Sequence, residues 1–235
     1  MHHHALATAF RRLGLLALVS LAAWAGPAAA QAREQDLVDS ARATFESFMG
    51  DPNMTWLQQH IGVARGVLIA PQILRAGFVF GGAGGRGVLF TRNDQTGRWE
   101  GPAFYNLATA SVGLQAGVAV SEAVTLVMTD KGINSLLADS VKLGGDATIA
   151  AGPVGAGAQA DITTDFVAFT RDKGLYGGLN LDGTFIGVAN GLNESYYGRG
   201  VLPPDILLRA SVHNPDAERL AADISRATAP RTGLR

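Results

Sequence analysis

Cysteine is absent from the sequence. Its absence excludes disulfide bonds, thiolate metal sites, a cysteine nucleophile and the lipid-modified cysteine that anchors a bacterial lipoprotein. A chain of 235 residues without disulfides depends on its hydrophobic core, and a single domain of this size can bury a sufficient one.

Residues that commonly carry catalysis are also scarce. Three of the five histidines, His2-His3-His4, lie in an N-terminal leader, which leaves only His60 and His213. There is no G-x-S-x-G elbow, no H-E-x-x-H motif and no calcium-loop ladder of Asp and Asn. We therefore expect a protein that is not an enzyme and that holds neither a metal nor another cofactor.

The sequence has no excess of basic residues. It contains 19 Lys and Arg against 20 Asp and Glu, and the cationic residues are scattered singly. A nucleic-acid-binding domain is normally basic, with clustered Lys and Arg. Adsorption to anionic membranes likewise needs a polybasic segment. We therefore expect no nucleic-acid partner, and membrane affinity that does not rest mainly on charge.

Only one long apolar run occurs, from Leu13 to Gly26. It follows Arg11-Arg12 and precedes a stretch of small residues, Pro27 to Ala32, which is the anatomy of an export signal peptide. The run is too short to span a membrane. Cleavage after Ala30 or after Ala32 is compatible with the sequence.

We expect residues 1–32 to be removed on export. The leader contains two of the basic residues and no acidic one, so its removal changes the formal net charge from −1 to −3. The mature chain is then expected in the periplasm, at the periphery of the envelope membrane or in the medium. Residues 33–228 form the predicted single domain, and 229–235 a flexible tail.

Glycine is abundant, with 30 residues. The run Gly82-Ala-Gly84-Gly85-Arg86-Gly87 fits the G-x-G-x-x-G pattern of dinucleotide-binding loops, which works only where the glycines open a helix. Here the β-branched and apolar residues Val88 to Thr91 follow, and then the turn-like run Asn93 to Gly97. We therefore predict a strand, a glycine turn over Gly81 to Gly87 and a second strand, with no nucleotide.

A second segment of small residues, KLGGDATIAAGPVGAGAQA, covers residues 142–160. Two interpretations stay open for it. The small residues could form a curved strand with crowded backbone positions. Alternatively, they could form a groove with a backbone floor that accepts an acyl chain or a headgroup.

The residues after the leader show a helical pattern. Apolar side chains recur three or four positions apart at Leu37, Val38, Ala41, Phe45 and Phe48. The pattern predicts an amphipathic helix that ends at Gly50-Asp51-Pro52, followed by a short helix over Met54 to Ile61.

The remaining chain favours strands until a final helix. From Arg65 to about Tyr197, short apolar runs alternate with Gly, Asp and Asn, and a C-terminal helix is expected after Asn214-Pro215. Three strand ends with Thr and a polar turn are typical of turn and helix-cap chemistry: LFTRND (89–94), VMTDKG (127–132) and FTRDKG (169–174). The predicted fold class is α+β, with a curved glycine-rich antiparallel sheet or partial barrel and N-terminal and C-terminal helices.

In these ordered blocks the sequence resembles the SYLF-domain family of lipid-binding proteins. The matching segments are ARGVLIAPQILRAGFVFGGAGGRGVLF (64–90), WEGPAFYNLATASVGLQAGV (99–118), VMTDKGINSLL (127–137), KLGGDATIAAGPVGAGA (142–158), FTRDKGLYGGLNLDG (169–183) and YYG (196–198). The resemblance implies binding of membrane lipids, and in eukaryotic members also of phosphoinositides and actin. Those members use a basic N-terminal segment. Here the helix over Glu34 to Met49 is net acidic, so phosphoinositide selectivity does not carry over, and no SH3 module is visible.

We therefore expect a non-enzymatic protein of the cell envelope that binds phospholipid or the membrane surface. Apolar contacts are expected from Phe45, Phe48, Met49, Trp56 and Leu57, and phosphate contacts from Arg65, Arg75 and Arg86. The alternatives are that the apolar stripe belongs to the core and that the arginines are isolated surface residues. A rival function is that of a structural envelope protein which binds another protein through its sheet or helices. The lipid species, its carriage in a groove and the oligomeric state stay open.

Overall fold

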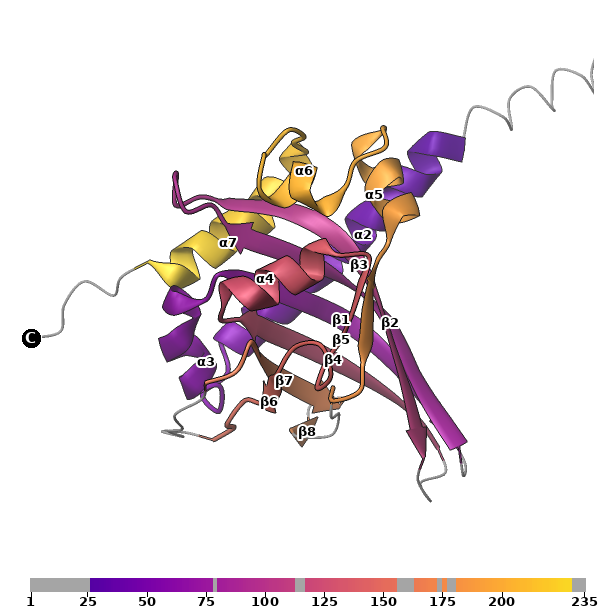
Figure 1. The fold of residues 1–235 in the computed structure, drawn as a ribbon, viewed down its shortest axis with the longest axis vertical. Coiled ribbons are helices and arrows are strands. Elements are labelled where there is room, and N and C mark those ends of the chain that lie inside the picture. The colour runs from indigo at the N-terminus through magenta and orange to yellow at the C-terminus, as the bar shows by residue number, and fades with distance from the viewer. Residues whose placement is uncertain are drawn as a thin grey trace, which may run out of the picture.

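The computed structural model describes residues 26–77, 80–112, 117–155, 163–172, 175–176 and 181–229, which form one curled sheet flanked by helices (Figure 1). The strands are β1 (Gly66–Gly77), β2 (Phe80–Arg92), β3 (Trp99–Val112), β4 (Gly117–Val127), β5 (Ser140–Lys142), β6 (Ile149–Ala151), β7 (Phe166–Asp172), β8 (Leu175–Tyr176) and β9 (Phe185–Val188). The helices are α2 (Gly26–Met49), α3 (Thr55–His60), η1 (Ile61–Val63), α4 (Asp130–Leu137), α5 (Asn190–Tyr197), α6 (Pro203–Leu207), η2 (Pro215–Ala217) and α7 (Glu218–Thr228).

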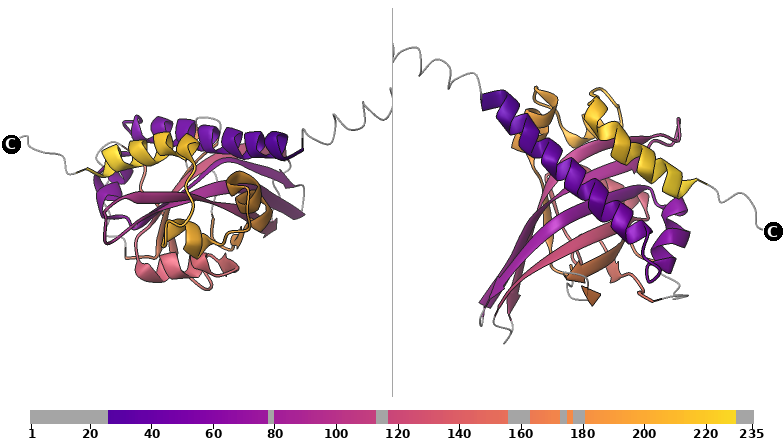
Figure 2. Two further views of the ribbon diagram at one scale, coloured as in Figure 1. Left: turned by 90° about the horizontal axis from the view of Figure 1, so that it is seen from above. Right: turned by 180° about the vertical axis from the view of Figure 1, so that it is seen from behind.

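The sheet is antiparallel apart from one strand pair at its edge. The strand order is β5-β9-β3-β2-β1-β4-β7-β6, with β8 paired to β7, and β6 runs parallel to β7. Four long strands, β3, β2, β1 and β4, form its centre and curl as an open half-barrel (Figure 2). This confirms the predicted α+β fold with a curved antiparallel sheet between terminal helices.

Helices cover the two faces of the sheet in separate layers. On one face α2 and α7 lie side by side, while α4 lies on the opposite face (Figure 2). The core under α2 takes alternate side chains of the strands, including Val67 and Ile69, and the core under α4 takes Leu68 and Ala70. Alternation with period two thus divides each strand between two cores.

The N-terminal helix follows the predicted pattern. Val38, Phe45 and Phe48 point into the core, and α2 ends at Met49, immediately before the predicted stop. The described part of the helix begins at Gly26, so it includes both predicted cleavage positions. Residues 1–25 and 230–235 lie outside the described structure, and the signal peptide and the flexible tail remain predictions.

The predicted glycine turn is wrong. Residues Gly81 to Gly87 lie inside the continuous strand β2, which pairs with β1 on one side and β3 on the other. The physical reason is close strand approach at a bulge in β1 between Ile69 and Gln72. A Cβ added at Gly85 would lie 2.5 Å from the carbonyl oxygen of Gln72, so only glycine fits there. Glycine therefore makes curvature here and not a chain reversal.

The other glycine-rich segment, 142–160, contains the last residue of β5, a turn and the short strand β6, and its residues 156–160 lie outside the described structure. A Cβ added at Gly152 would lie 2.3 Å from the ring of Phe169. The described part thus fits the interpretation of a crowded strand. The turn predicted over Asn93 to Gly97 is confirmed between β2 and β3, where the Asn93 side chain accepts the backbone N–H groups of the next turn residues.

Candidate functional site

A groove lies where α2 crosses the glycine-rich part of β1 and β2. Its volume is about 440 Å³, within the size range of small-molecule sites. One residue of α5 also contributes to its wall. The lining residues are Arg33, Glu34, Leu37, Gln72, Leu74, Gly84, Gly85, Arg86 and Leu192.

Strand register explains why these residues meet. Gln72 of β1 lies opposite Arg86 of β2, and Leu74 lies opposite Gly84. Residues directly opposite each other in an antiparallel pair share a face of the sheet, which here is the face under α2. Because Gly84 has no side chain, the sheet backbone forms the floor of the groove beneath the helix.

Three leucines make part of the groove wall apolar. Leu37 projects from α2 and Leu192 from α5, and both are only partly buried. Leu74 closes the sheet side and remains 48% exposed. These leucines offer a surface for alkyl groups, and its burial by a ligand is worth roughly 25 cal/mol per Å².

Three charged side chains line the same groove. Arg33 and Arg86 are exposed, and neither forms an ion pair within the described part of the chain. Glu34 is only 6% exposed, and its Oε2 has no hydrogen-bond partner among the described residues. The site thus presents two cations with donor capacity and one buried acceptor.

Comparison with known proteins identifies the family. Residues 108–227, about half of the chain, match the Ysc84 family model, which is described as Las17-binding protein actin regulator. The chain belongs to the SYLF family, also called Ysc84. The resemblance inferred from the sequence blocks is therefore confirmed.

Several SYLF relatives are known from eukaryotes. LAS seventeen-binding protein 3 of Saccharomyces cerevisiae is 30% identical over 142 residues, covering 57% of this chain and 30% of the relative. SH3 domain-containing YSC84-like protein 1 of Homo sapiens is 27% identical over 165 residues, covering 68% and 48% of the two chains. This chain thus spans less than half the length of these relatives. No solved structure matches it.

The structure separates the three arginines singled out in the sequence. Arg86 lies in the groove. Arg65 forms ion pairs with Asp94 at 3.3 Å and Asp130 at 2.9 Å, away from it. Arg75 belongs to the opposite face of the sheet, because it neighbours Leu74 along the strand, and it pairs with Asp172. A shared phosphate site for all three is therefore excluded in this fold.

The apolar residues singled out for membrane contact form part of the core. Phe45, Phe48, Trp56 and Leu57 are at most 2% exposed and pack together between α2, α3 and the sheet. Met49 is partly buried against the same cluster. These positions agree with the alternative interpretation, in which the apolar stripe of the N-terminal helix belongs to the core. Insertion of these side chains into a bilayer is not available to the folded domain.

Sequence reasoning missed most of the groove. The sequence predicts only a net acidic helix at Glu34, and it assigns no binding role to Arg33, Gln72, Leu74 or Leu192. Their proximity depends on strand register and on the docking of α5 against α2, which no local pattern encodes. The one indication in the sequence was a groove with a backbone floor, which was considered for 142–160. In the described structure, Gly84 and Gly85 of the other glycine run form such a floor.

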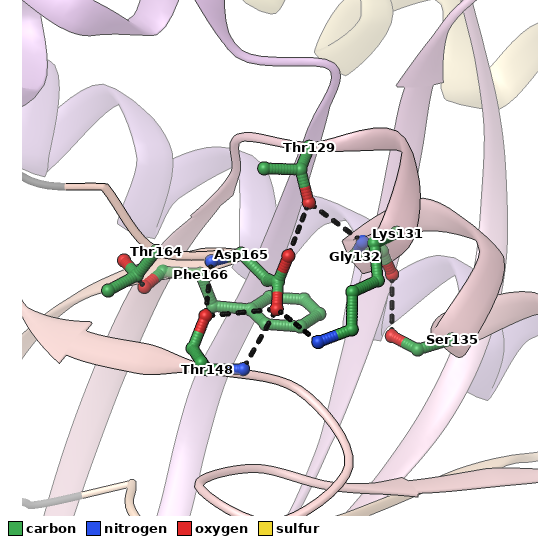
Figure 3. A network of polar contacts seen from close by, with 8 residues as sticks. All are labelled: Thr129, Lys131, Gly132, Ser135, Thr148, Thr164, Asp165 and Phe166. Atoms are coloured by element: carbon green, nitrogen blue, oxygen red, sulfur yellow. Dashed lines mark hydrogen bonds and ion pairs between the residues drawn. The ribbon is translucent and has the colours of Figure 1, made fainter.

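A second polar cluster surrounds Asp165 at the start of β7 (Figure 3). The Thr129 hydroxyl donates to this carboxylate at 2.6 Å while it caps α4 by accepting the N–H of Gly132. The backbone N–H and hydroxyl of Thr148 both donate to it at 2.9 Å, and Lys131 lies 3.3 Å away. The cluster ties together three segments and confirms the cap predicted from VMTDKG.

Burial and hydrogen bonding act in opposite directions on Asp165. Burial alone would raise the pKa of its carboxyl group, but the hydrogen bonds from Thr129 and Thr148 and the nearby Lys131 outweigh it and lower the pKa to about 2. The group is therefore a carboxylate at neutral pH. It has its donors within the protein, so we assign the cluster to stability.

The remaining candidates for chemistry lie outside the groove. His60 stacks on Trp56 with ring centroids 3.9 Å apart, and His213 contacts Glu218. Among the described residues, no cluster of His, Asp and Glu could hold a metal ion, and no helix has the length and apolar character needed to cross a membrane.

Proposed function

We propose that this SYLF domain binds a phospholipid in the groove between α2 and the strands β1 and β2, without catalysing a reaction. The observation that carries the proposal is the combination of a glycine floor, leucine walls and two arginines without ion pairs in the described structure. Guanidinium groups bind phosphate through paired hydrogen bonds. The leucines supply the apolar contact that an acyl chain or glycerol backbone requires.

The sheet beyond the groove supports the same proposal. On the α2 face, Leu74 is 48% and Val118 73% exposed, and the intervening positions include Ala76 and Gly82. A smooth surface of small and apolar residues therefore continues from the groove along the strands. An acyl chain that leaves the groove would lie on this surface and remove it from water.

A groove-filling variant tests the proposal. A Cβ added at Gly84 would have only the carbonyl oxygen of Leu107 within 4 Å, at 3.8 Å, so the strand accepts a side chain there. Gly84→Leu should fill the groove. We expect loss of co-purified lipid in native mass spectrometry and at least about tenfold weaker flotation with phospholipid vesicles, at an unchanged melting temperature.

Gly82→Leu is the matched control. Gly82 lies on the same strand and the same face but does not line the groove, and its added Cβ would lie 3.4 Å from the nearest atom, the carbonyl oxygen of Thr109. This variant leaves the groove open and adds only an apolar side chain to the surface beside it, so it should bind lipid at least as well as the parent. Equal lipid binding by a folded Gly84→Leu variant would overturn the groove as the lipid site.

We also propose that the protein acts in the cell envelope after export. The support is the leader over residues 1–32, with its basic pair, apolar run and small-residue end. N-terminal sequencing of protein from an envelope fraction should give Gln31 or Arg33 as the first residue. Since Arg33 and Glu34 line the groove, cleavage would place the mature N-terminus beside the lipid site. An intact leader in the mature pool would contradict export by cleavage.

Protein binding is the second candidate function. The names of the family model and of the yeast relative, which refer to Las17 binding, favour it. If a protein docks on the exposed strands, Val118→Glu should abolish its binding, because Val118 is exposed there. Gly84→Leu should leave that binding unchanged, because the groove lies apart from Val118. A lipid in the groove gives the opposite result for Gly84→Leu.

A further inference from the structure

The acidic side chain in the groove lacks a partner within the described protein. Glu34 lies on α2, is 6% exposed, and its Oε2 is buried without a hydrogen bond from any described residue. A carboxylate oxygen withdrawn from water without a donor is costly. Because Glu34 lines the groove, a molecule bound there lies against its side chain and can supply a donor to the carboxylate.

The arginines of the groove do not neutralise this carboxylate directly. Arg33 is the neighbour of Glu34 in the helix and Arg86 comes from β2, yet neither nitrogen lies within ion-pair distance of Glu34 among the described contacts. Both guanidinium groups are exposed at the groove. Positive and negative groups are therefore held apart in one cavity, and an occupant can contact both.

We infer that the groove selects a headgroup with both a phosphate and a protonated primary amine, as in phosphoethanolamine. This inference rests on the proposed lipid-binding function. The phosphate accepts hydrogen bonds from Arg33 and Arg86, and the ammonium group donates to Glu34. A choline headgroup has no N–H to donate, and a glycerol headgroup brings no cation for the carboxylate. The amine thus distinguishes the preferred lipid from other phospholipids.

Vesicle flotation of the protein as purified from the envelope fraction tests this selectivity. The probes are vesicles of phosphatidylcholine alone, with added phosphatidylethanolamine, or with added phosphatidylglycerol. The parent should prefer phosphatidylethanolamine. Glu34→Gln keeps the shape and removes the charge, so this preference should fall about tenfold, the effect of one lost charge-assisted hydrogen bond. Arg86→Gln should weaken binding to all the vesicles, since each of these lipids carries a phosphate.

Glu46→Gln is the matched control on the same helix. Glu46 is exposed and pairs with Arg42 at 2.7 Å, outside the groove, so its neutral variant should keep the parent preference. Glu34→Gln removes a buried charge without a partner among the described residues, so it is not expected to unfold the domain. Thermal melts of both variants check this.

The outcomes separate the headgroup inference from the proposed function. Equal binding of phosphatidylethanolamine and phosphatidylglycerol, unchanged by Glu34→Gln but abolished by Gly84→Leu, would overturn the inference and leave lipid binding intact. No flotation with any vesicle and no co-purified lipid would overturn both. Calorimetry with free phosphoethanolamine identifies the source of the headgroup: binding that is lost in Glu34→Gln supports the same recognition for a soluble ligand.

Discussion

The two halves of the four long strands differ in what covers them. In the half nearer the helices, the α2 face carries large side chains that are almost fully buried: Val67, Ile69, Val88, Phe90, Phe104, Val124 and Leu126. In the outer half, the same face carries small or isolated side chains that are exposed: Leu74, Ala76, Gly82, Gly84, Ala108, Ala110 and Val118. The outer ends of the strands project beyond the helices (Figure 1).

This difference separates stability from recognition within one sheet. Each large side chain buried in the inner half contributes about 1.5–3 kcal/mol through the hydrophobic effect. The outer half makes the same backbone ladder but buries little on this face, so its residues are less constrained by packing. The groove lies at the boundary, where the first turns of α2 leave the packed half and pass over glycine.

The largest effect should follow from removing the contacts that hold α2 to the inner half. Phe45 and Phe48 are 2% and 0% exposed, and replacement of such a ring by a small residue costs about 3–5 kcal/mol. The double variant Phe45→Ser/Phe48→Ser should therefore unfold the domain. Circular dichroism and urea denaturation measure this. A folded double variant with reduced vesicle flotation would instead restore membrane insertion by this face.

The packed half is also the part that sequence could predict. The spacing of Val38, Phe45 and Phe48 and the stop after Met49 are local features, because a helix places residues three and four apart on one face. Short apolar runs divided by Gly, Asp and Asn from Arg65 onward likewise predicted the sheet, and the glycine content predicted its curvature. The spacing of apolar residues along the chain indicates which side chains are buried, and most side chains of the inner half on the α2 face are buried.

The structure of the outer half could not be predicted in the same way. The glycine run indicated a turn because glycine is common in turns, whereas in the structure it continues a strand whose partners lie 6 to 28 residues away in sequence. The groove needs Arg33, Gln72 and Leu192 to meet, and only the assembled sheet and the docked α2 and α5 bring them together. A site formed by residues without a local pattern is invisible before the tertiary contacts are known.

A smaller effect should follow from acidification, through the cluster that joins α4 to the sheet edge. The pKa of Asp165 is lowered from 3.8 to about 2 in the fold, so its stabilisation is complete above about pH 4 and is lost as pH falls towards 2. The shift corresponds to about 2 kcal/mol. Thermal melts between pH 2 and 7 should show a weaker pH dependence for Asp165→Asn, which is destabilised at neutral pH. Identical slopes for parent and variant would exclude this role.

The smallest effect on stability should come from the outer half itself. Val118 and Val124 lie on the same strand and the same face, but Val118 is 73% exposed and Val124 is fully buried. Val118→Ser should change the free energy of unfolding by less than about 0.5 kcal/mol, since a surface substitution loses no packing. Val124→Ser should cost about 2 kcal/mol, because it removes buried methyl groups from the core. Urea denaturation compares the two. Equal losses of unfolding free energy for the two variants would mean that Val118 is covered in solution. The outer half would then be packed like the inner half. A stable Val118→Ser variant with weaker flotation would place lipid contact on the outer strands.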